Sequence, residues 1–359
     1  MGIPNLRHRY AWVLAGRHNQ APTGTEPGPR AEFEVFLERF GGELLSTSML
    51  DEPLPFLARA LKFAGQSSLG LASVVQSRME RFDAIVASGE DIGIPIAMAS
   101  LAGGFQIPIH MMFHGHHLES ARLRLLAPAL RRLPYLHFHC LSEALRKRTQ
   151  RVLGIPAERC HATGYGVDTS YFAGGPVAQT AMIASAGAAN RDYETLAAAV
   201  RDLPVTLNIA ADSTWVRPKR EMEKTGWPAN VEARSYGTYA RLRDLYRRAS
   251  FVVVPLLPAT HACGYAVIAE GMAMGRAVIA TRTASPPDFL RPGSTGLFTE
   301  VHDVEGLRAH ILHLLEHPDE ATEMGRQARA LIVEDYSLER FCDRLESIVA
   351  RSIEKRHVA

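Results

Sequence analysis

Short apolar runs alternate with amphipathic stretches along most of this 359-residue chain. Such alternation is typical of βα units, in which each strand leads into a helix that covers a parallel sheet. The run 251–255 is the clearest buried strand, because every residue before its final proline is apolar. The other expected strands are 10–15, 43–49, 83–88, 107–113, 135–141, 181–186, 205–210, 231–235 and 277–281. The pattern therefore predicts an α/β fold.

The alternation is interrupted at 164–176, a segment that contains several glycines and a proline, and then starts again. A chain of this length suits two domains. We expect an N-terminal Rossmann-like domain over 1–170, a C-terminal Rossmann-like domain over 171–335 and a helical tail over 336–359. A ligand would bind in the cleft between two such domains.

The composition excludes several functional classes. The formal net charge is only +2, so no global field recruits nucleic acid or membrane. The four cysteines are scattered without a C-x-x-C pair, which fits reduced thiols better than a disulfide framework. No signal peptide and no apolar stretch long enough to span a bilayer is present in the sequence. We therefore expect a soluble, cytoplasmic protein.

The strongest local signal follows the strand at 251–255. A loop carrying His261 and Gly264 leads into a helix that begins near Tyr265 and contains Glu270. Unpaired N–H groups at a helix N-terminus suit a diphosphate, and a carboxylate on the exposed side of the helix can accept hydrogen bonds from a ribose diol. The alternative is that Glu270 is a solvated helix residue and His261 an ordinary loop residue.

A second candidate for phosphate binding lies at the start of the second half of the chain. A predicted strand ends in a loop of small residues that includes Gly187, and Arg191 follows near the start of a helix. Small residues let backbone amides approach phosphate, and arginine can hold two oxygens at once. Alternatively, Arg191 is a surface residue paired with Asp192 or Glu194. A second basic cluster at 217–220 is either a phosphate contact or a solvated loop.

In the first half, a histidine cluster follows the strand at 107–113. His114, His116 and His117 surround a glycine there. Imidazoles at a strand end suggest metal ligands, a general base or polar contacts to substrates. No acidic partner motif accompanies them, so metal is the weakest of these options, and plain solvation is the remaining alternative.

Two basic stretches are expected to be helical. Ser142 is placed to cap a helix whose later part is basic. The stretch 122–132 interleaves arginines with Leu and Ala, which would allow contact with a membrane surface if the acceptor is a lipid. A helix with a solvated basic face is the more usual explanation.

The segment 251–298 resembles the signature of the family-four retaining glycosyltransferases, which have the GT-B fold. Glu270 takes the place of the family's second glutamate, and the first falls on Ala262, beside His261. The other matching residues are Met272, Ala273, Met274, Gly275, Ala277, Val278, Ile279, Ala280 and Thr281. Further similar segments are Gly166-Val-Asp-Thr with Phe172, Arg291-Pro-Gly-Ser-Thr-Gly-Leu-Phe, and Tyr336-Ser337.

This resemblance implies two parallel sheets facing across a cleft and a C-terminal helix that returns to the first domain. It implies a retaining transfer from a nucleotide-diphosphate sugar to a small-molecule, glycan or lipid-linked acceptor, by a front-face mechanism without metal or cofactor. The donor-binding residues would be Glu270, His261, Gly264, Tyr265, Gly187 and Tyr236, the last beside the base. The catalytic residues would be His114, His116 and Arg191.

Two alternatives stay open at this point. A sugar-nucleotide epimerase of the same fold would share Glu270 and the cleft, and a catalytically inactive relative would bind the nucleotide sugar without turnover. A dehydrogenase is disfavoured, because no G-x-G-x-x-G motif follows the first strand.

Overall fold

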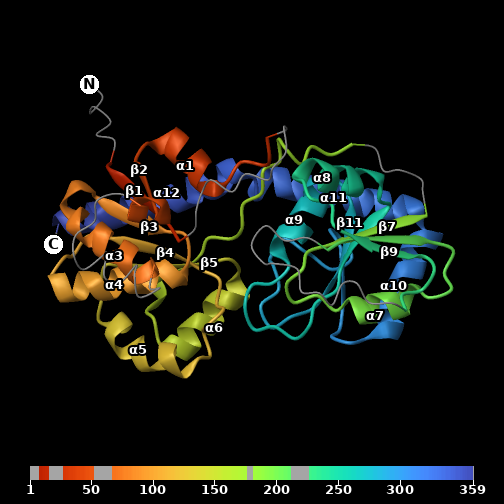
Figure 1. Cartoon of the computed structure of the whole chain (residues 1–359), viewed down its shortest axis with the longest axis horizontal. Coiled ribbons are helices and arrows are strands. Elements are labelled where there is room, and N and C mark those ends of the chain that lie inside the picture. The colour runs from red at the N-terminus through yellow and green to blue at the C-terminus, as the bar shows by residue number, and fades with distance from the viewer. Residues whose placement is uncertain (1–7, 16–26, 52–66, 176–180, 212–225, 359) are drawn as a thin grey trace. The chain divides into compact units, whose positions relative to one another are not determined.

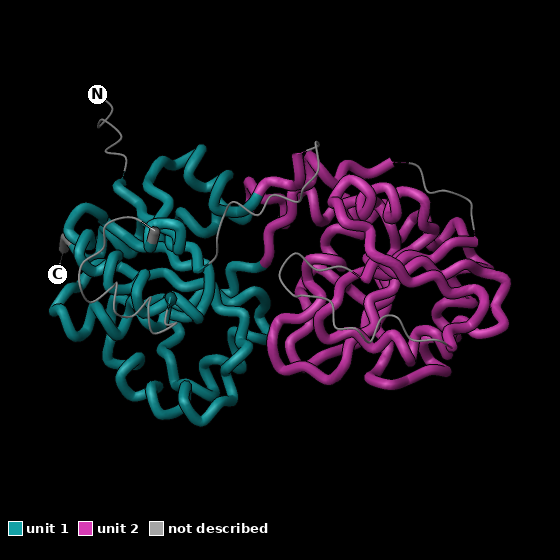
Figure 2. The backbone as a smooth tube through the Cα atoms, viewed as in Figure 1, with its two compact units in different colours: residues 1–20, 31–164, 341–359 teal, residues 21–30, 165–340 magenta. Residues whose placement is uncertain are grey.

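The computed structural model describes residues 8–15, 27–51, 67–175, 181–211 and 226–358 (Figure 1). The basic cluster predicted at 217–220 lies outside these residues. The chain divides into two compact units, shown in teal and magenta in Figure 2. Unit 1 comprises Met1–Gln20, Ala31–Gly164 and Phe341–Ala359, and unit 2 comprises Ala21–Arg30 and Tyr165–Arg340.

Within its described residues, unit 1 contains a six-stranded sheet in the order β2-β1-β3-β4-β5-β6, and each neighbouring pair is parallel. Its strands are β1 (Tyr10–Leu14), β2 (Glu43–Ser46), β3 (Ala84–Ala87), β4 (Ile109–Phe113), β5 (Leu136–Cys140) and β6 (Cys160–Ala162). Its helices are α1 (Glu32–Phe40), α3 (Ser67–Ser77), α4 (Glu90–Gly103), α5 (Ala121–Arg131), α6 (Glu143–Leu153) and the greater part of α12 (Leu338–Val358).

The described part of unit 2 has a second six-stranded parallel sheet, in the order β12-β11-β10-β7-β8-β9. Its strands are β7 (Met182–Ala186), β8 (Thr206–Ala210), β9 (Val231–Arg234), β10 (Phe251–Val254), β11 (Ala277–Thr281) and β12 (Leu297–Thr299). Its helices are α7 (Tyr193–Val200), α8 (Tyr239–Arg248), α9 (Tyr265–Ala273), α10 (Val304–Glu316) and α11 (Pro318–Asp335).

The predicted α/β fold with parallel sheets is confirmed, and the differences are local. The strand expected at 43–49 ends at Ser46, and a 3-10 helix, Thr47–Asp51, follows. That turn buries Leu50 against Val74 of α3, a contact that sequence periodicity does not reveal. Strands β6 and β12 were not predicted, because three residues each are too few to show an alternating pattern.

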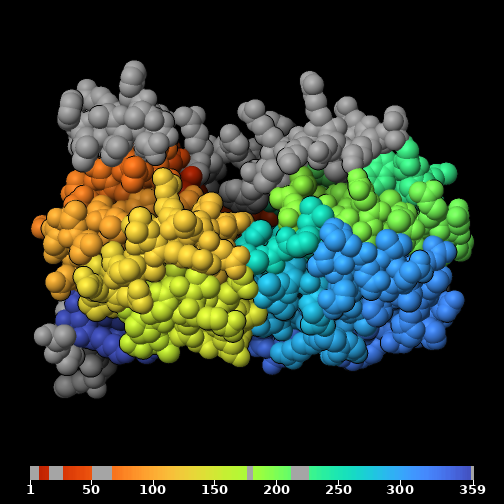
Figure 3. All heavy atoms as spheres, turned by 90° about the horizontal axis from the view of Figure 1, so that it is seen from below, coloured from red at the N-terminus to blue at the C-terminus, as the bar shows by residue number. Residues whose placement is uncertain are grey.

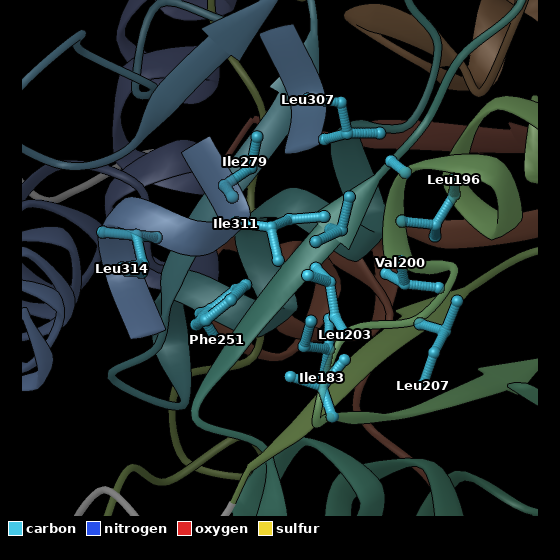
Figure 4. Close-up of a cluster of buried hydrophobic side chains, with 14 of the residues drawn as sticks. Ile183, Leu196, Val200, Leu203, Leu207, Phe251, Ile279, Leu307, Ile311 and Leu314 are labelled. Carbon is cyan, nitrogen blue, oxygen red and sulfur yellow. The ribbon is translucent and has the colours of Figure 1, made fainter. Parts of the chain in front are cut away.

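Unit 2 is stabilised by a core in which α7 and α10 pack on the sheet (Figure 4). Leu196 and Val200 of α7 meet side chains of α10 over the strands, as the close-up shows. The labelled α10 residues are Leu307, Ile311 and Leu314, at the spacing of one helix face. Fully burying each such side chain stabilises the fold by about 1.5–3 kcal/mol, before the cost in conformational entropy.

The C-terminal helix α12 adds a similar apolar face to unit 1. Phe341, Leu345, Val349 and Ile353 recur every four residues and are all buried. The hydroxyl of Tyr10 in β1 also donates to Oε1 of Glu346 across 3.0 Å. The predicted return of the C-terminal helix to the first domain is thereby confirmed.

The two basic stretches form helices as expected. Ser142 caps α6, and its Oγ accepts a hydrogen bond from the backbone N–H of Leu145. Helix α5 lies at the surface of unit 1 (Figure 3, yellow) and leaves Leu125 81% exposed. Contact of this helix with a lipid surface stays a prediction. None of the described helices has both the length and the apolar content that crossing a membrane requires.

Candidate functional site

The strand order of unit 2 provides the first indication of a site. From the central pair of β7 and β10, the chain continues through β8 and β9 toward one edge and through β11 and β12 toward the other. The connections that leave the carboxyl ends of β7 and β10 therefore diverge. In open α/β sheets, ligands bind in the crevice at such a switch point. The loops after β7 and β10 are the two stretches in which the sequence predicted the donor site.

Hydrogen bonds join these two loops directly. The backbone N–H of Asp192 donates to the carbonyl of Pro255 across 3.2 Å, and the N–H of Leu257 donates to the carbonyl of Asn190 across 3.3 Å. The side-chain amide of Asn190 also donates to the carbonyl of Leu257 at 3.1 Å. The loop that carries Arg191 is therefore fixed against the loop that leads to α9.

Arg191 folds back over its own loop. Its Nε donates to the carbonyl of Ala186 and its Nη1 to that of Ala189, each across 2.8 Å. Gly187 has a φ of +98°, and a Cβ at that position would lie 2.5 Å from Nη2 of Arg191. Asp192, the alternative partner for Arg191, instead caps α7 and pairs with His302 at 2.7 Å. Glycine at 187 thus provides both the backbone geometry and the space for the guanidinium.

Glu270 lies in α9 and is only 9% exposed. The hydroxyl of Tyr246, from α8, donates to its Oε2 across 2.9 Å. Burial raises the pKa of Glu270 to about 7, although the hydrogen bond from Tyr246 and the charge of Arg191 both oppose the rise. The expectation that Glu270 points to the exposed side of α9 is wrong, as is its reading as a solvated residue. The reason is that every residue of α9 except Ala266 is buried, and Tyr246 supplies a buried partner.

The N-terminus of α9 is shaped by Gly264. This residue is the N-cap, has a φ of +77° and lies so close to β10 that a Cβ would be 3.2 Å from Cγ1 of Val254. Glycine has no side chain to cap the first-turn N–H groups of α9. Those groups and the positive end of the helix dipole therefore suit an anion.

The remaining predicted donor residues lie nearby or elsewhere in unit 2. Tyr265 is buried at the start of α9, and its hydroxyl donates to the carbonyl of Ser285 at 2.8 Å. His261 is half-buried in the loop before α9. Tyr236 is buried after β9, with the guanidinium of Arg234 5.0 Å from its ring centre. Their roles toward a donor stay predictions.

The two predicted histidines lie in unit 1, in the loop that follows β4. Their rings are 5.9 Å apart and nearly parallel, with Gly115 between them at a φ of +82°. The backbone N–H groups of His114 and His116 both donate to the carboxylate of Glu90, a residue that sequence reasoning missed. Across the described residues, no three His, Cys, Asp or Glu side chains converge in an arrangement suited to a metal ion.

Some signal for the missed residues was present in the sequence. Glu90 is the first residue of a helix that follows Gly89 and the predicted strand at 83–88. The helix dipole stabilises a carboxylate at that position. Tyr246 is one of several aromatic or apolar positions in α8, and nothing local marks it as the partner of Glu270.

Comparison with known proteins finds similarity to a family model in one segment. Residues 184–317 match the family model of the group 1 glycosyl transferases. A segment of 82 residues is 32% identical to the N-acetyl-alpha-D-glucosaminyl L-malate synthase of Bacillus anthracis. That segment is 23% of this chain and spans only 22% of the length of the synthase.

Solved structures match along nearly the whole chain. The sucrose-phosphate synthase of Thermosynechococcus elongatus has a TM-score of 0.74 at 16% identity, with 96% of this chain and 99% of that chain covered. Anabaena HepE, in complex with UDP and glucose, has a TM-score of 0.69 at 15% identity, over 96% and 99% of the two chains. At such identities the likeness shows the fold alone. The predicted GT-B fold is confirmed.

Proposed function

Because residues 184–317 match the family model of the group 1 glycosyl transferases, we propose that this protein transfers a sugar from a nucleotide-diphosphate donor to an acceptor hydroxyl. The transfer retains the anomeric configuration and needs neither metal nor cofactor. The acceptor is a small molecule, a glycan or a lipid-linked sugar.

One arrangement carries this proposal: the buried Glu270, the guanidinium of Arg191 and the open N-terminus of α9 all gather around the switch point of the second sheet. The charge of Arg191 lowers the pKa of Glu270, so the two groups influence each other electrostatically. All three elements lie within the segment that matches the family. A carboxylate, a cation and a helix N-terminus suit a ribose diol and a diphosphate.

The same groups support a mechanism. The departing diphosphate gains negative charge, which Arg191 and the N-terminus of α9 would stabilise. A front-face transfer uses the leaving diphosphate to help remove the proton of the acceptor hydroxyl, so it requires no carboxylate nucleophile. Positioning of the two substrates then provides much of the rate. Anabaena HepE is crystallised with UDP and glucose, which makes UDP the first nucleotide to test here.

The test is the thermal stability of the protein in UDP, GDP, TDP and ADP, in the presence of a chelator. A ligand at 100 times its dissociation constant stabilises the native state by about 2.7 kcal/mol. We expect one nucleotide to raise the midpoint of the wild type and of the control Glu305→Ala, an exposed residue of α10, but not of Glu270→Ala. Absence of a shift with all four nucleotides would contradict the donor site.

Turnover then separates the remaining functions. A transferase consumes the donor faster when an acceptor is present, and NMR of the product reports its anomeric configuration. An epimerase converts the donor without an acceptor. A protein that binds the nucleotide but turns over no donor would be the catalytically inactive relative.

A further inference from the structure

Glu90 is a buried carboxylate whose two oxygens are both used by a single loop. The side chain is 4% exposed. Its Oε2 accepts the backbone N–H of His114 across 2.9 Å, and its Oε1 accepts the backbone N–H of His116 across 2.8 Å. A carboxylate that bridges two N–H groups two residues apart fixes the backbone between them more strongly than either bond alone.

The fold brings Glu90 to this loop by close packing of α4 on β4. Gly93, one turn after Glu90, faces Met111 of β4, and a Cβ on Gly93 would lie 2.5 Å from Cγ and Sδ of that methionine. Glu90 is also the first residue of α4, so the helix dipole favours its negative charge. Gly115, at the tip of the loop, has a φ of +82°, which only glycine adopts without strain.

The pKa values of the His114 and His116 imidazoles are shifted in opposite directions. Burial by itself would lower the pKa of His114, but the hydrogen bond and charge of Glu90, together with Glu32 and Asp91, raise it above its ordinary value. For His116, burial is the largest effect and the pKa is lowered. A pair of neighbouring groups with opposite shifts is typical of an acid and base assignment. The loop therefore places an imidazole whose charged form Glu90 stabilises beside one whose neutral form burial favours.

We propose that Glu90 is a positioning residue that fixes the His114–His116 loop and orients the imidazole of His114 toward an anionic oxygen of the substrate. Nδ1 of His114 lies 3.5 Å from Oε2 of Glu90, which leaves Nε2 as the second donor of the protonated ring. This inference rests on the proposed function, since the anionic oxygen belongs to a substrate of that transfer. It assigns Glu90 no contact with the substrate.

The test compares Glu90→Gln and Glu90→Asp with the control Glu38→Gln, an exposed carboxylate of α1 in the same unit. Histidines labelled at Cε1 are titrated by NMR, and the signal of His114 is assigned by its loss in His114→Gln. We expect a midpoint above the reference value of about 6.5 in the wild type, a lower midpoint in Glu90→Gln and the higher value kept in Glu90→Asp. Hydrogen exchange of the N–H groups of His114 and His116 should speed up in both Glu90 variants but not in the control.

Donor turnover provides the second readout. Misplaced catalytic groups commonly cost about 10- to 100-fold, so we expect kcat of Glu90→Gln to fall by that range, with the donor KM changed by less than about threefold. Glu90→Asp, which keeps the charge but is too short to hold both N–H groups, should lie between the wild type and Glu90→Gln. The fall of kcat in Glu90→Gln should also be smaller at low pH, where His114 is charged without help.

The two proposals fail in different ways. A wild type that turns over no nucleotide sugar refutes the proposed function, while the titration and the exchange still report on Glu90. An unchanged His114 midpoint and unchanged exchange in Glu90→Gln would overturn the inference. If circular dichroism shows that Glu90→Gln is unfolded, the inference is judged on Glu90→Asp, which keeps the buried charge. Hydrogen exchange of the His114 and His116 N–H groups in that variant is then the deciding measurement.

Discussion

The hydroxyl of Tyr246 donates a hydrogen bond to Oε2 of Glu270 across 2.9 Å, and both side chains are buried. The bond favours the ionised carboxylate, whereas burial favours the protonated one. Because the pKa of Glu270 is raised to about 7, small changes in its surroundings alter its charge near neutral pH.

Replacing Tyr246 with Phe should weaken nucleotide binding without removing any group that contacts the nucleotide. Loss of the hydrogen bond from the Tyr246 hydroxyl raises the pKa of Glu270 further. A protonated carboxyl is a poorer acceptor for ribose hydroxyls. We expect affinity at pH 7 to fall by about 3- to 10-fold, the equivalent of one hydrogen bond. Affinity should rise with pH as Glu270 ionises. Calorimetric titrations from pH 6 to 9 should show this rise at a higher pH in Tyr246→Phe than in the wild type. Tyr135→Phe, in unit 1, is the control, and equal affinities at every pH would contradict the prediction.

Glu270→Gln should increase the stability of unit 2 at high pH while abolishing nucleotide binding. The folded pKa is raised from 4.5 to about 7, so the contribution of Glu270 to stability is fully present below pH 4.5 and is lost as pH rises through 7. The shift is roughly 2.5 pH units, which corresponds to an upper limit of about 3 kcal/mol. We expect the variant to be more stable than the wild type by about 1–3 kcal/mol at pH 8. Urea unfolding of the variant, the wild type and Glu305→Gln measures this, and a less stable variant at pH 8 refutes it.

A chain of hydrogen bonds between neutral histidines lies beneath α12. Ser352 donates to the carbonyl of Val349, so its Oγ accepts from Nε2 of His110 at 2.8 Å. Burial lowers the pKa of both imidazoles, which favours their neutral forms. In a neutral pair, Nδ1 of His110 accepts from Nε2 of His139 at 2.8 Å, and Nδ1 of His139 accepts from the hydroxyl of Thr163 at 2.6 Å. A proton added to Nδ1 of either ring would remove an acceptor.

Acid should therefore destabilise unit 1 as the pH falls below the ordinary pKa of histidine. Burial lowers the pKa of His110 and His139 well below 6.5, that of His161 to about 4 and that of His137 to about 3. Nearby positive charges add to this effect, namely Arg146, Arg159, Arg351 and Lys355. The contribution of these histidines to folding stability is thus fully present above pH 6.5. It is lost as pH falls toward their pKa values in the folded protein.

The expected slope is about 1.4 kcal/mol per pH unit for each histidine that only the unfolded chain protonates. Hydrogen exchange of β4 and β5 between pH 6.5 and 4.5 measures the slope. His161→Gln should reduce the slope by the contribution of one histidine. His317→Gln, which replaces an exposed histidine, should leave the slope unchanged. A wild type whose protection is constant over this range would disprove the effect.

Gly187→Ala should displace Arg191. The added methyl would lie 2.5 Å from Nη2, and the φ of +98° is itself unfavourable for alanine. Loss of a charge-assisted contact to phosphate costs about 1.5–3 kcal/mol, so we expect affinity for the nucleotide to fall by about 10- to 100-fold. Gly293→Ala is the control, because its φ is +74° but nothing lies within 4 Å of the added methyl. Equal affinity losses in the two variants would show that backbone strain, and not Arg191, is responsible.

Local patterns in the sequence were enough to predict most of the elements. The strand Ala277–Thr281 has its predicted bounds, and α9 begins at Tyr265 as expected. These predictions succeeded because apolar periodicity, glycines and caps act over a few residues and are visible in any short window. The two-domain α/β architecture follows from the same repeated pattern.

Only the tertiary structure decided which side chains meet. Tyr246 and Glu270 are 24 residues apart, and Glu90 is 24 residues from His114. Strand order, which places the loop after β7 beside the loop after β10, is likewise not written in any local pattern. The charge of a carboxylate depends on burial and on partners that come from other helices and loops. For that reason the sequence by itself determined the type of residue at each position, while packing determined whether Glu270 and Glu90 face solvent or a partner.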